Sequence, residues 1–106
     1  MMIDSELYSL GIPFRYECEL IIDEKTYYPD FTIYKAKTHE IRYWEHLGNM
    51  DDPAYVRKSC QKLEEYSLNG IYPGVNLYLT YETGTHQIDI SKIHSTALEI
   101  KEWIES

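Results

Sequence analysis

Hydrophobic and polar residues alternate along much of the first half of the chain, which is typical of β-strands with one buried face. Three stretches carry this pattern, at residues 14–22, 26–34 and 39–47. A polar turn at residues 23–25 separates the first two, and a tight connection at Ala36-Lys37 separates the second from the third. We therefore predict three consecutive strands, the last two forming a hairpin about Ala36-Lys37.

Helical signals mark three other segments. Residues 5–10 predict one or two helical turns, because Gly11 and Pro13 follow them. A second helix is predicted from Pro53 to about Leu68, because Asp51 or Asp52 is suited to cap its start and Asn69-Gly70 to end it. A fourth strand is expected at residues 75–81. The last helix starts near Asp89 or Ser91 and carries apolar residues at helical spacing: Ile93, Ala97, Ile100 and Ile104.

The predicted order is therefore helix, three strands, helix, strand and helix. Strands and helices arranged around one sheet belong to the α/β or α+β class. The chain has 106 residues, which suits a single domain over residues 1–106. Its hydrophobic fraction of 43% and charged fraction of 26% are ordinary for a globular protein, so disorder is not expected.

Several classes of protein are disfavoured by composition. No apolar run approaches the roughly 20 residues that span a bilayer, and the first residues do not form a signal peptide. Cys18 and Cys60 make neither a disulfide framework nor a zinc motif, so we expect reduced thiols in a cytoplasmic protein. The doubled Met1-Met2 and the short first helix are also compatible with a fragment of a longer protein.

The formal net charge of −8 argues against a domain that grips nucleic acid through bulk electrostatics, because such domains are usually basic. It does not exclude a metal site, which needs carboxylates, or a local cationic groove. It also fits a domain whose binding affinity comes in part from a partner or from flanking sequence. The eleven tyrosines indicate a base-stacking surface only where basic residues surround them.

Two acids on neighbouring predicted strands are the first candidates for chemistry. A hairpin about Ala36-Lys37 places Asp30 opposite Tyr43, so Glu45 becomes the diagonal neighbour of Asp30 on the same sheet face. Diagonal neighbours lie roughly 7–8 Å apart at the backbone. Two carboxylates at that spacing can converge on one hard cation such as Mg²⁺, which takes only one or two carboxylates from a protein. A one-residue slip would separate the acids onto opposite faces.

The alternative is that Asp30 and Glu45 are ordinary solvated strand residues. Their neighbours oppose it, because an acid on an apolar face is costly unless it is paired or bound to a metal. Large apolar or aromatic side chains flank both acids: Tyr28, Phe31, Tyr43, Trp44 and Leu47.

Lys62 on the second predicted helix is the candidate cation. It shares a stripe with Tyr55 and Tyr66, beside an apolar stripe of Val56, Cys60 and Leu63 that we expect to pack on the sheet. At the edge of the buried face its ammonium could reach a phosphate or an attacking hydroxide. Alternatively, Lys62 pairs with Tyr66 or Glu65, or extends to water.

The histidines form no helical zinc pair. His46 follows Glu45 and should point to the other face of the sheet, so only its backbone carbonyl is a candidate metal ligand.

These residues resemble the PD-(D/E)XK nucleases, which place Pro-Asp at the end of one strand and Glu-x-Lys on the next. Tyr28-Pro29-Asp30-Phe31-Thr32-Ile33 resembles the first part, and Trp44-Glu45-His46-Leu47-Gly48 resembles the second with Leu47 in place of the lysine. Some branches carry the lysine on the following helix. The stretch from Asp52-Pro53-Ala54-Tyr55 through Lys62 to Tyr66-Ser67-Leu68-Asn69-Gly70-Ile71 resembles that arrangement.

The resemblance extends over residues 5–104, including Gly11-Ile12-Pro13-Phe14-Arg15-Tyr16-Glu17 and Asn76-Leu77-Tyr78-Leu79-Thr80-Tyr81-Glu82. It implies a restriction-endonuclease-like αβββαβ core, a mixed sheet flanked by helices, of the kind found alone or attached to helicases.

The function that the resemblance implies is hydrolysis of DNA phosphodiester bonds with Mg²⁺ or Mn²⁺. Asp30 and Glu45 would hold the metal, and Lys62 would assist the nucleophile. Around them, Glu6, Glu17 and Tyr66 are candidates to support the site.

Two other functions stay open. The chain could be a catalytically inactive nuclease-fold domain that binds nucleic acid or protein, which the acidic charge favours. It could also be a small acidic protein-binding regulator, for which Asp30, Glu45 and Lys62 should lie far apart.

Overall fold

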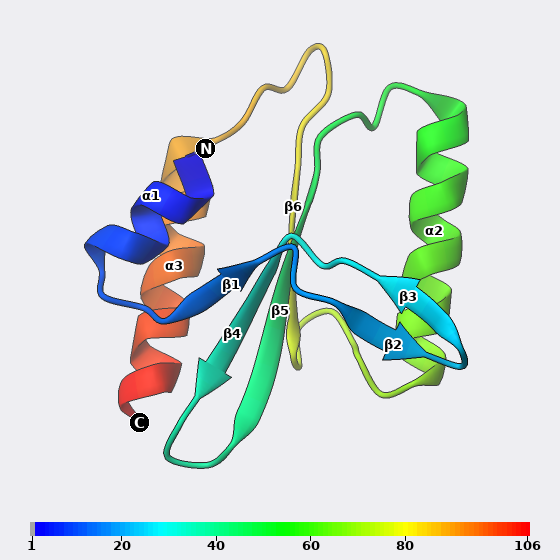
Figure 1. Cartoon of the computed structure of the whole chain (residues 1–106). Helices are drawn as coiled ribbons and strands as arrows, with labels where there is room; N and C mark the ends of the chain where they lie inside the picture. The colour runs from blue at the N-terminus through cyan, green and yellow to red at the C-terminus, as the bar shows by residue number, and fades with distance from the viewer. Residues whose placement is uncertain (1) are drawn as a thin grey trace.

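Four strands form the central sheet, in the order β1-β4-β5-β6 (Figure 1). The computed structural model describes residues 2–106. The first three strands pair antiparallel, and β6 runs parallel to β5, so the sheet is mixed. The strands of this sheet are β1 (Phe14–Tyr16), β4 (Phe31–Lys35), β5 (Glu40–Leu47) and β6 (Leu77–Tyr81).

Three helices cover the two faces of the sheet. α1 (Met2–Ser9) and α3 (Ile90–Glu105) lie together on one face, and α2 (Pro53–Leu68) lies on the other (Figure 1). A separate two-stranded hairpin, β2 (Leu20–Ile22) and β3 (Lys25–Tyr27), lies on the α2 side. The fold is therefore α+β, with a mixed sheet flanked by three helices, as the sequence predicted. None of the helices within residues 2–106 combines the length and the apolar character needed to cross a bilayer.

Successive residues of each strand face opposite layers. Phe31, Ile33 and Trp44 point into the core beneath α1 and α3. Leu77 and the partly buried Tyr43 instead face the core beneath α2 and the β2–β3 hairpin. The odd-numbered residues of β5 therefore point toward α2, and Glu45 is one of them.

Two of the predicted strands are each interrupted, and this part of the prediction was wrong. Residues 14–22 divide into β1 and β2, because Glu17 adopts a left-handed conformation with φ 49°. Residues 26–34 divide into β3 and β4 at Pro29, which is buried and has no N–H to donate to a ladder. The two halves of each stretch pair in different sheets.

The register of the β4–β5 hairpin also differs from the prediction. The turn spans four residues, 36–39, and ends at His39 with φ 61°, whose N–H donates to the Lys35 carbonyl at 2.9 Å. Lys35 pairs with Glu40 and Phe31 with Trp44, two residues away from the predicted pairing. An even shift keeps every side chain on its predicted face.

The boundaries of α2 and the start of α3 follow the predicted caps, whereas α1 runs from Met2 to Ser9 and begins before its predicted start at Ser5. The side chain of Asp52 accepts from the Ala54 N–H at 3.0 Å, and Asp89 caps α3 in the same way. The predicted packing of Cys60 on the sheet was wrong, because Cys60 is exposed. The residues of α2 that are buried are Ser59 and Tyr66, so the buried face is rotated toward the stripe that contains Lys62.

Candidate functional site

Asp30 and Glu45 lie opposite each other where β4 begins. Phe31 pairs with Trp44, so Asp30, one residue earlier, faces Glu45 directly rather than diagonally. The Asp30 N–H donates to Oε1 of Glu45 at 2.8 Å, and the His46 N–H donates to Oδ2 of Asp30 at 2.6 Å. Each carboxylate is thus fixed by a backbone amide of the other strand segment, and the two acids are brought together.

Two side chains from α2 complete this cluster. Nζ of Lys62 lies 2.5 Å from Oε2 of Glu45, and the Tyr66 hydroxyl donates to the same oxygen at 3.3 Å. Lys62 and Tyr66 reach one point because they are four positions apart on one helix face. Glu45 is only 1% exposed, whereas 30% of the Lys62 side chain is exposed. A buried acid with a cation partner is not the solvated strand residue of the alternative interpretation.

The pKa of Asp30 is raised, chiefly because its carboxyl is partly buried and also because the charge of Glu45 is nearby. The His46 amide and the Lys62 ammonium oppose this rise. The pKa of Tyr66 is raised too, first by burial and then by Glu45, so the Tyr66 hydroxyl keeps its proton and remains a donor. Two acids are held close together in a partly desolvated site, and a cation placed there would relieve their repulsion.

His46 contributes through its backbone. Its imidazole points to the opposite face, where Nδ1 lies 2.7 Å from Oγ1 of Thr80 and Nε2 lies 2.8 Å from Oε1 of Glu82. Trp44 Nε1 donates to the same Thr80 hydroxyl at 3.0 Å. In an extended strand the N–H and C=O of one residue point to the same side. The His46 carbonyl therefore lies on the Asp30 side of β5.

The oxygen atoms of the cluster suit a hard divalent cation. Within residues 2–106, Oδ1 of Asp30 receives no hydrogen bond. Within the same range, the carboxylate of Glu45 accepts from three donors, whereas a carboxylate has room for about four. The same residues contain no group of three or more His, Cys, Asp or Glu side chains arranged to hold a metal. Two carboxylates and one carbonyl match Mg²⁺ or Mn²⁺, because Mg²⁺ keeps several of its waters.

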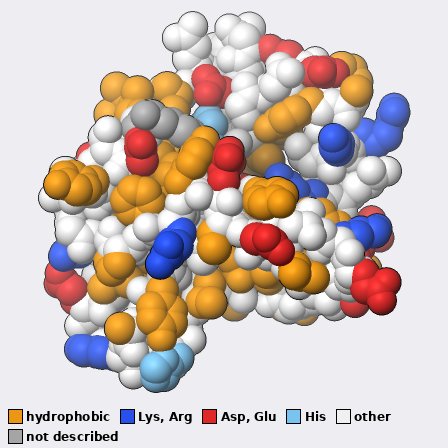
Figure 2. Space-filling model, viewed as in Figure 1, with side chains coloured by type: hydrophobic (Ala, Val, Ile, Leu, Met, Phe, Trp, Pro, Cys, Tyr) orange, Lys and Arg blue, Asp and Glu red, His pale blue; other side chains and the backbone are white. Residues whose placement is uncertain are grey.

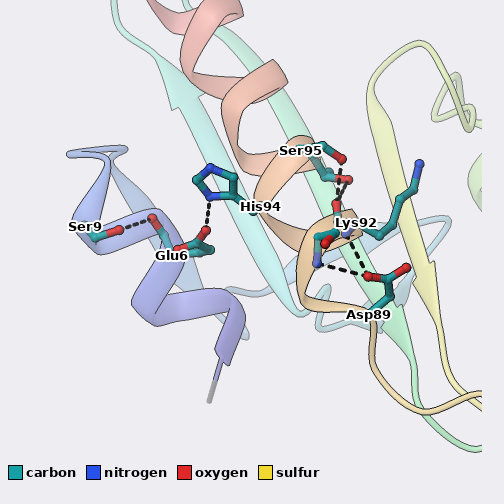
Figure 3. Close-up of polar contacts among 8 residues, drawn as sticks. Glu6, Ser9, Asp89, Lys92, His94 and Ser95 are labelled. Carbon is teal, nitrogen blue, oxygen red and sulfur yellow. Dashed lines mark hydrogen bonds and ion pairs between the residues drawn. The ribbon is translucent and has the colours of Figure 1, made fainter.

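The remaining predicted residues occupy three different settings. Leu47 is buried, and the ammonium group of the cluster comes from Lys62 on α2. Glu17 is exposed, and its N–H donates to the Asp30 carbonyl at 3.0 Å, so it supports the site through the backbone. Glu6 is paired instead with His94 across α1 and α3, as Figure 3 shows.

Sequence reasoning missed the support behind β5. Thr80 and Glu82 hold the His46 imidazole from β6 and the loop that follows it. The Gly48 N–H donates to the Tyr55 hydroxyl at 3.2 Å, which ties the end of β5 to α2. No local pattern identifies these contacts, because they join residues from 7 to 36 positions apart.

No known protein family matches the chain, and no curated protein matches it significantly.

Proposed function

We propose that this protein is a metal-dependent nuclease that hydrolyses phosphodiester bonds of DNA, using Mg²⁺ or Mn²⁺. The observation that carries the proposal is the convergence of Asp30, which directly precedes β4, with Glu45 of β5 and Lys62 of α2. The same convergence argues against the protein-binding regulator, for which these residues should lie far apart.

In this proposal Asp30 and Glu45 hold the cation, together with the carbonyl of His46. The cation, when bound, supplies a water of lowered pKa and offsets negative charge on the phosphate. Asp30 brings an oxygen that is free of protein donors, and the His46 amide fixes the orientation of its carboxyl group. Glu45 is oriented by the Asp30 amide and by Tyr66.

Lys62 orients the nucleophile and stabilises negative charge that develops on the phosphate. Its stem is partly exposed, so the ammonium can turn from Glu45 toward a substrate. Tyr66 stays protonated, so it continues to hold Glu45 when Lys62 turns away.

The resemblance to PD-(D/E)XK nucleases supports this assignment, because the order of a helix, three sheet strands, a helix and a strand agrees with an αβββαβ core. A restriction-endonuclease-like fold is part of the proposal, as is a cytoplasmic location. DNA is the proposed substrate. A helicase or another DNA-processing protein is the proposed partner, since the net charge of −8 leaves the chain weak in long-range attraction for DNA.

The test is cleavage of supercoiled plasmid and of labelled oligonucleotides in MgCl₂ or MnCl₂. We expect cleavage by the unmodified protein and none by Asp30→Ala or Glu45→Ala. Glu40→Ala is the matched control, because Glu40 is an exposed acid on β5. Cleavage that persists in both site variants, or cleavage that does not depend on a metal ion, rules the proposal out.

A catalytically inactive nuclease-fold domain is the second candidate, and one contact favours it. The Lys62–Glu45 pair already gives Glu45 a cation partner within the chain. That function predicts no cleavage and no stabilisation by Mn²⁺, whereas an active site gains stability from metal in proportion to its occupancy. Thermal unfolding with and without MnCl₂ separates the two.

A further inference from the structure

A groove runs between the β2–β3 hairpin and α2, next to the candidate site. Its volume is about 780 Å³. Lys25 and Tyr27 line it from the hairpin, and Tyr55, Lys58 and Lys62 line it from α2. In Figure 2, Lys and Arg side chains (blue) lie over α2 and in the hollow beside it.

The lining of this groove has the opposite charge to the protein as a whole. It contains three lysines against two glutamates, Glu64 and Glu65, whereas the chain has 10 Lys and Arg against 18 Asp and Glu. Lys25 and Lys58 are both exposed. A local cationic lining on an acidic protein is suited to an anion, because it concentrates positive charge where the surrounding surface repels one.

The groove and the candidate site share residues. Lys62 lines the groove and contacts Oε2 of Glu45 at 2.5 Å. Tyr27 forms part of the groove wall and packs edge-to-face on Tyr66, with ring centroids 5.6 Å apart. An anionic chain that lies in the groove is therefore led to the point where Asp30 and Glu45 converge.

The size and chemistry of the groove favour a single strand. Its volume falls within the roughly 300–1,000 Å³ of pockets that enclose a small ligand, which matches a short run of nucleotides and not a duplex. Tyr27 and Tyr55 provide two aromatic rings among lysines, which is the combination that stacks unpaired bases and follows a phosphate backbone.

We infer that this groove binds a single-stranded segment of DNA and directs its phosphates along Lys25 and Lys58 toward Lys62. The inference rests on the proposed nuclease function, for which it names the substrate as single-stranded DNA. The β2–β3 hairpin, which is not part of the central sheet, then serves as the outer wall of the strand's path.

The test measures binding in EDTA, where a metal-dependent enzyme leaves its substrate intact. Fluorescence anisotropy follows a labelled 12-nucleotide single strand, its duplex and its RNA counterpart over a range of salt concentrations. We expect the DNA single strand to bind more tightly than either. For Lys25→Ala/Lys58→Ala, the log–log slope of affinity against salt should fall by about 1.4, since each phosphate contact to a single strand contributes about 0.7.

The control is Lys37→Ala/Lys92→Ala, which removes the same charge from two exposed lysines outside the groove. It should leave the slope close to that of the unmodified protein. An equal loss in both double variants, tighter binding of duplex or RNA, or no binding of the single strand overturns the inference. Circular dichroism verifies that both double variants are folded.

Cleavage assays keep the two proposals distinct. Under the inference, Lys25→Ala/Lys58→Ala raises KM for a single-stranded substrate and leaves kcat unchanged. Groove-dependent binding without cleavage in Mg²⁺ or Mn²⁺ would remove the nuclease function and keep the strand path. Cleavage with unchanged KM in the double variant would keep the nuclease and remove the strand path.

Discussion

Replacing Asp30 by asparagine tests two properties separately: the effect of the Asp30 charge on the stability of the fold, and the capacity of the site to bind a metal ion. The carboxyl group of Asp30 is partly buried beside Glu45, and both factors raise its pKa in the folded protein. An acid whose pKa is raised on folding costs no stability below its unfolded pKa, near 4. The cost develops as the pH rises from the unfolded pKa through the folded pKa, and it is fully present above the folded pKa.

The size of this cost sets the expected gain. Each unit of pKa difference corresponds to about 1.4 kcal/mol, and solvent screening at a partly exposed site reduces that figure. Asparagine removes the charge of Asp30 and keeps an oxygen that accepts from the His46 N–H. We therefore expect Asp30→Asn to raise the free energy of unfolding at pH 7 in EDTA, and each 1 kcal/mol of gain should raise Tm by about 4–8 °C.

Adding metal should make the unmodified protein more stable than Asp30→Asn. A ligand at 100 times its Kd stabilises a folded protein by about 2.7 kcal/mol, so MnCl₂ should raise the Tm of the unmodified protein above that of the variant. Thermal unfolding followed by circular dichroism, at pH 4 and pH 7 and with EDTA or MnCl₂, measures both the effect of the Asp30 charge and the stabilisation by metal. Glu40→Gln is the control, because it removes an exposed charge from β5 and should keep the response to Mn²⁺.

Two results would refute this reasoning. One is that Asp30→Asn is less stable than the unmodified protein in EDTA at pH 7, because the charge of Asp30 would then be favourable to the fold. The other is an equal gain from Mn²⁺ in both proteins, because the cation would then bind elsewhere.

Three further predictions test the surroundings of the site. Lys62→Met should abolish cleavage, and it should lower the free energy of unfolding in urea by about 1–3 kcal/mol, because it leaves the buried Glu45 without its cation. This loss is smaller than for a fully buried pair, and unchanged stability would mean that the ion pair is not formed. Thr80→Val should cost about 1–3 kcal/mol by the same assay, because it removes the hydroxyl that contacts the His46 imidazole, and a neutral result would contradict that contact. Glu24→Gly should raise Tm by a few degrees, because Glu24 has φ 68° in a two-residue hairpin turn that favours glycine, and a lower Tm would contradict the turn.

The elements with strong local signals could be predicted from the sequence, and those that depend on distant pairing could not. α2 begins and ends at its predicted residues because Asp52-Pro53 and Asn69-Gly70 determine its ends locally. The break at Pro29 was missed because residues that favour strands, such as Tyr28 and Phe31, stand on both sides of it. What separates β3 from β4 is that β3 pairs with β2, while β4 pairs with β1 and β5.

The expected juxtaposition of Asp30 and Glu45 tolerated an error in the hairpin register because that error was even. The predicted turn is two residues shorter than the observed one, and the side chains of a strand repeat with a period of two. Glu45 therefore moved from a diagonal position to a direct one on the same face. The contacts of His46 with Thr80 and Glu82 could not be predicted in this way. They depend on the parallel pairing of β5 with β6, and these two strands are connected through α2 and not by a short turn.

Net charge is a poor guide to the proposed strand-binding groove, because it includes charges that lie too far away to act on the groove. The molecule extends 39 by 35 by 20 Å, whereas charges in physiological salt are screened beyond about 8 Å. Acids on the far side of the molecule therefore act only weakly on the groove. A phosphate in the groove responds chiefly to the charged residues that line it, which are Lys25, Lys58 and Lys62 against Glu64 and Glu65. Its affinity should therefore fall as salt is added even though the chain carries a charge of −8.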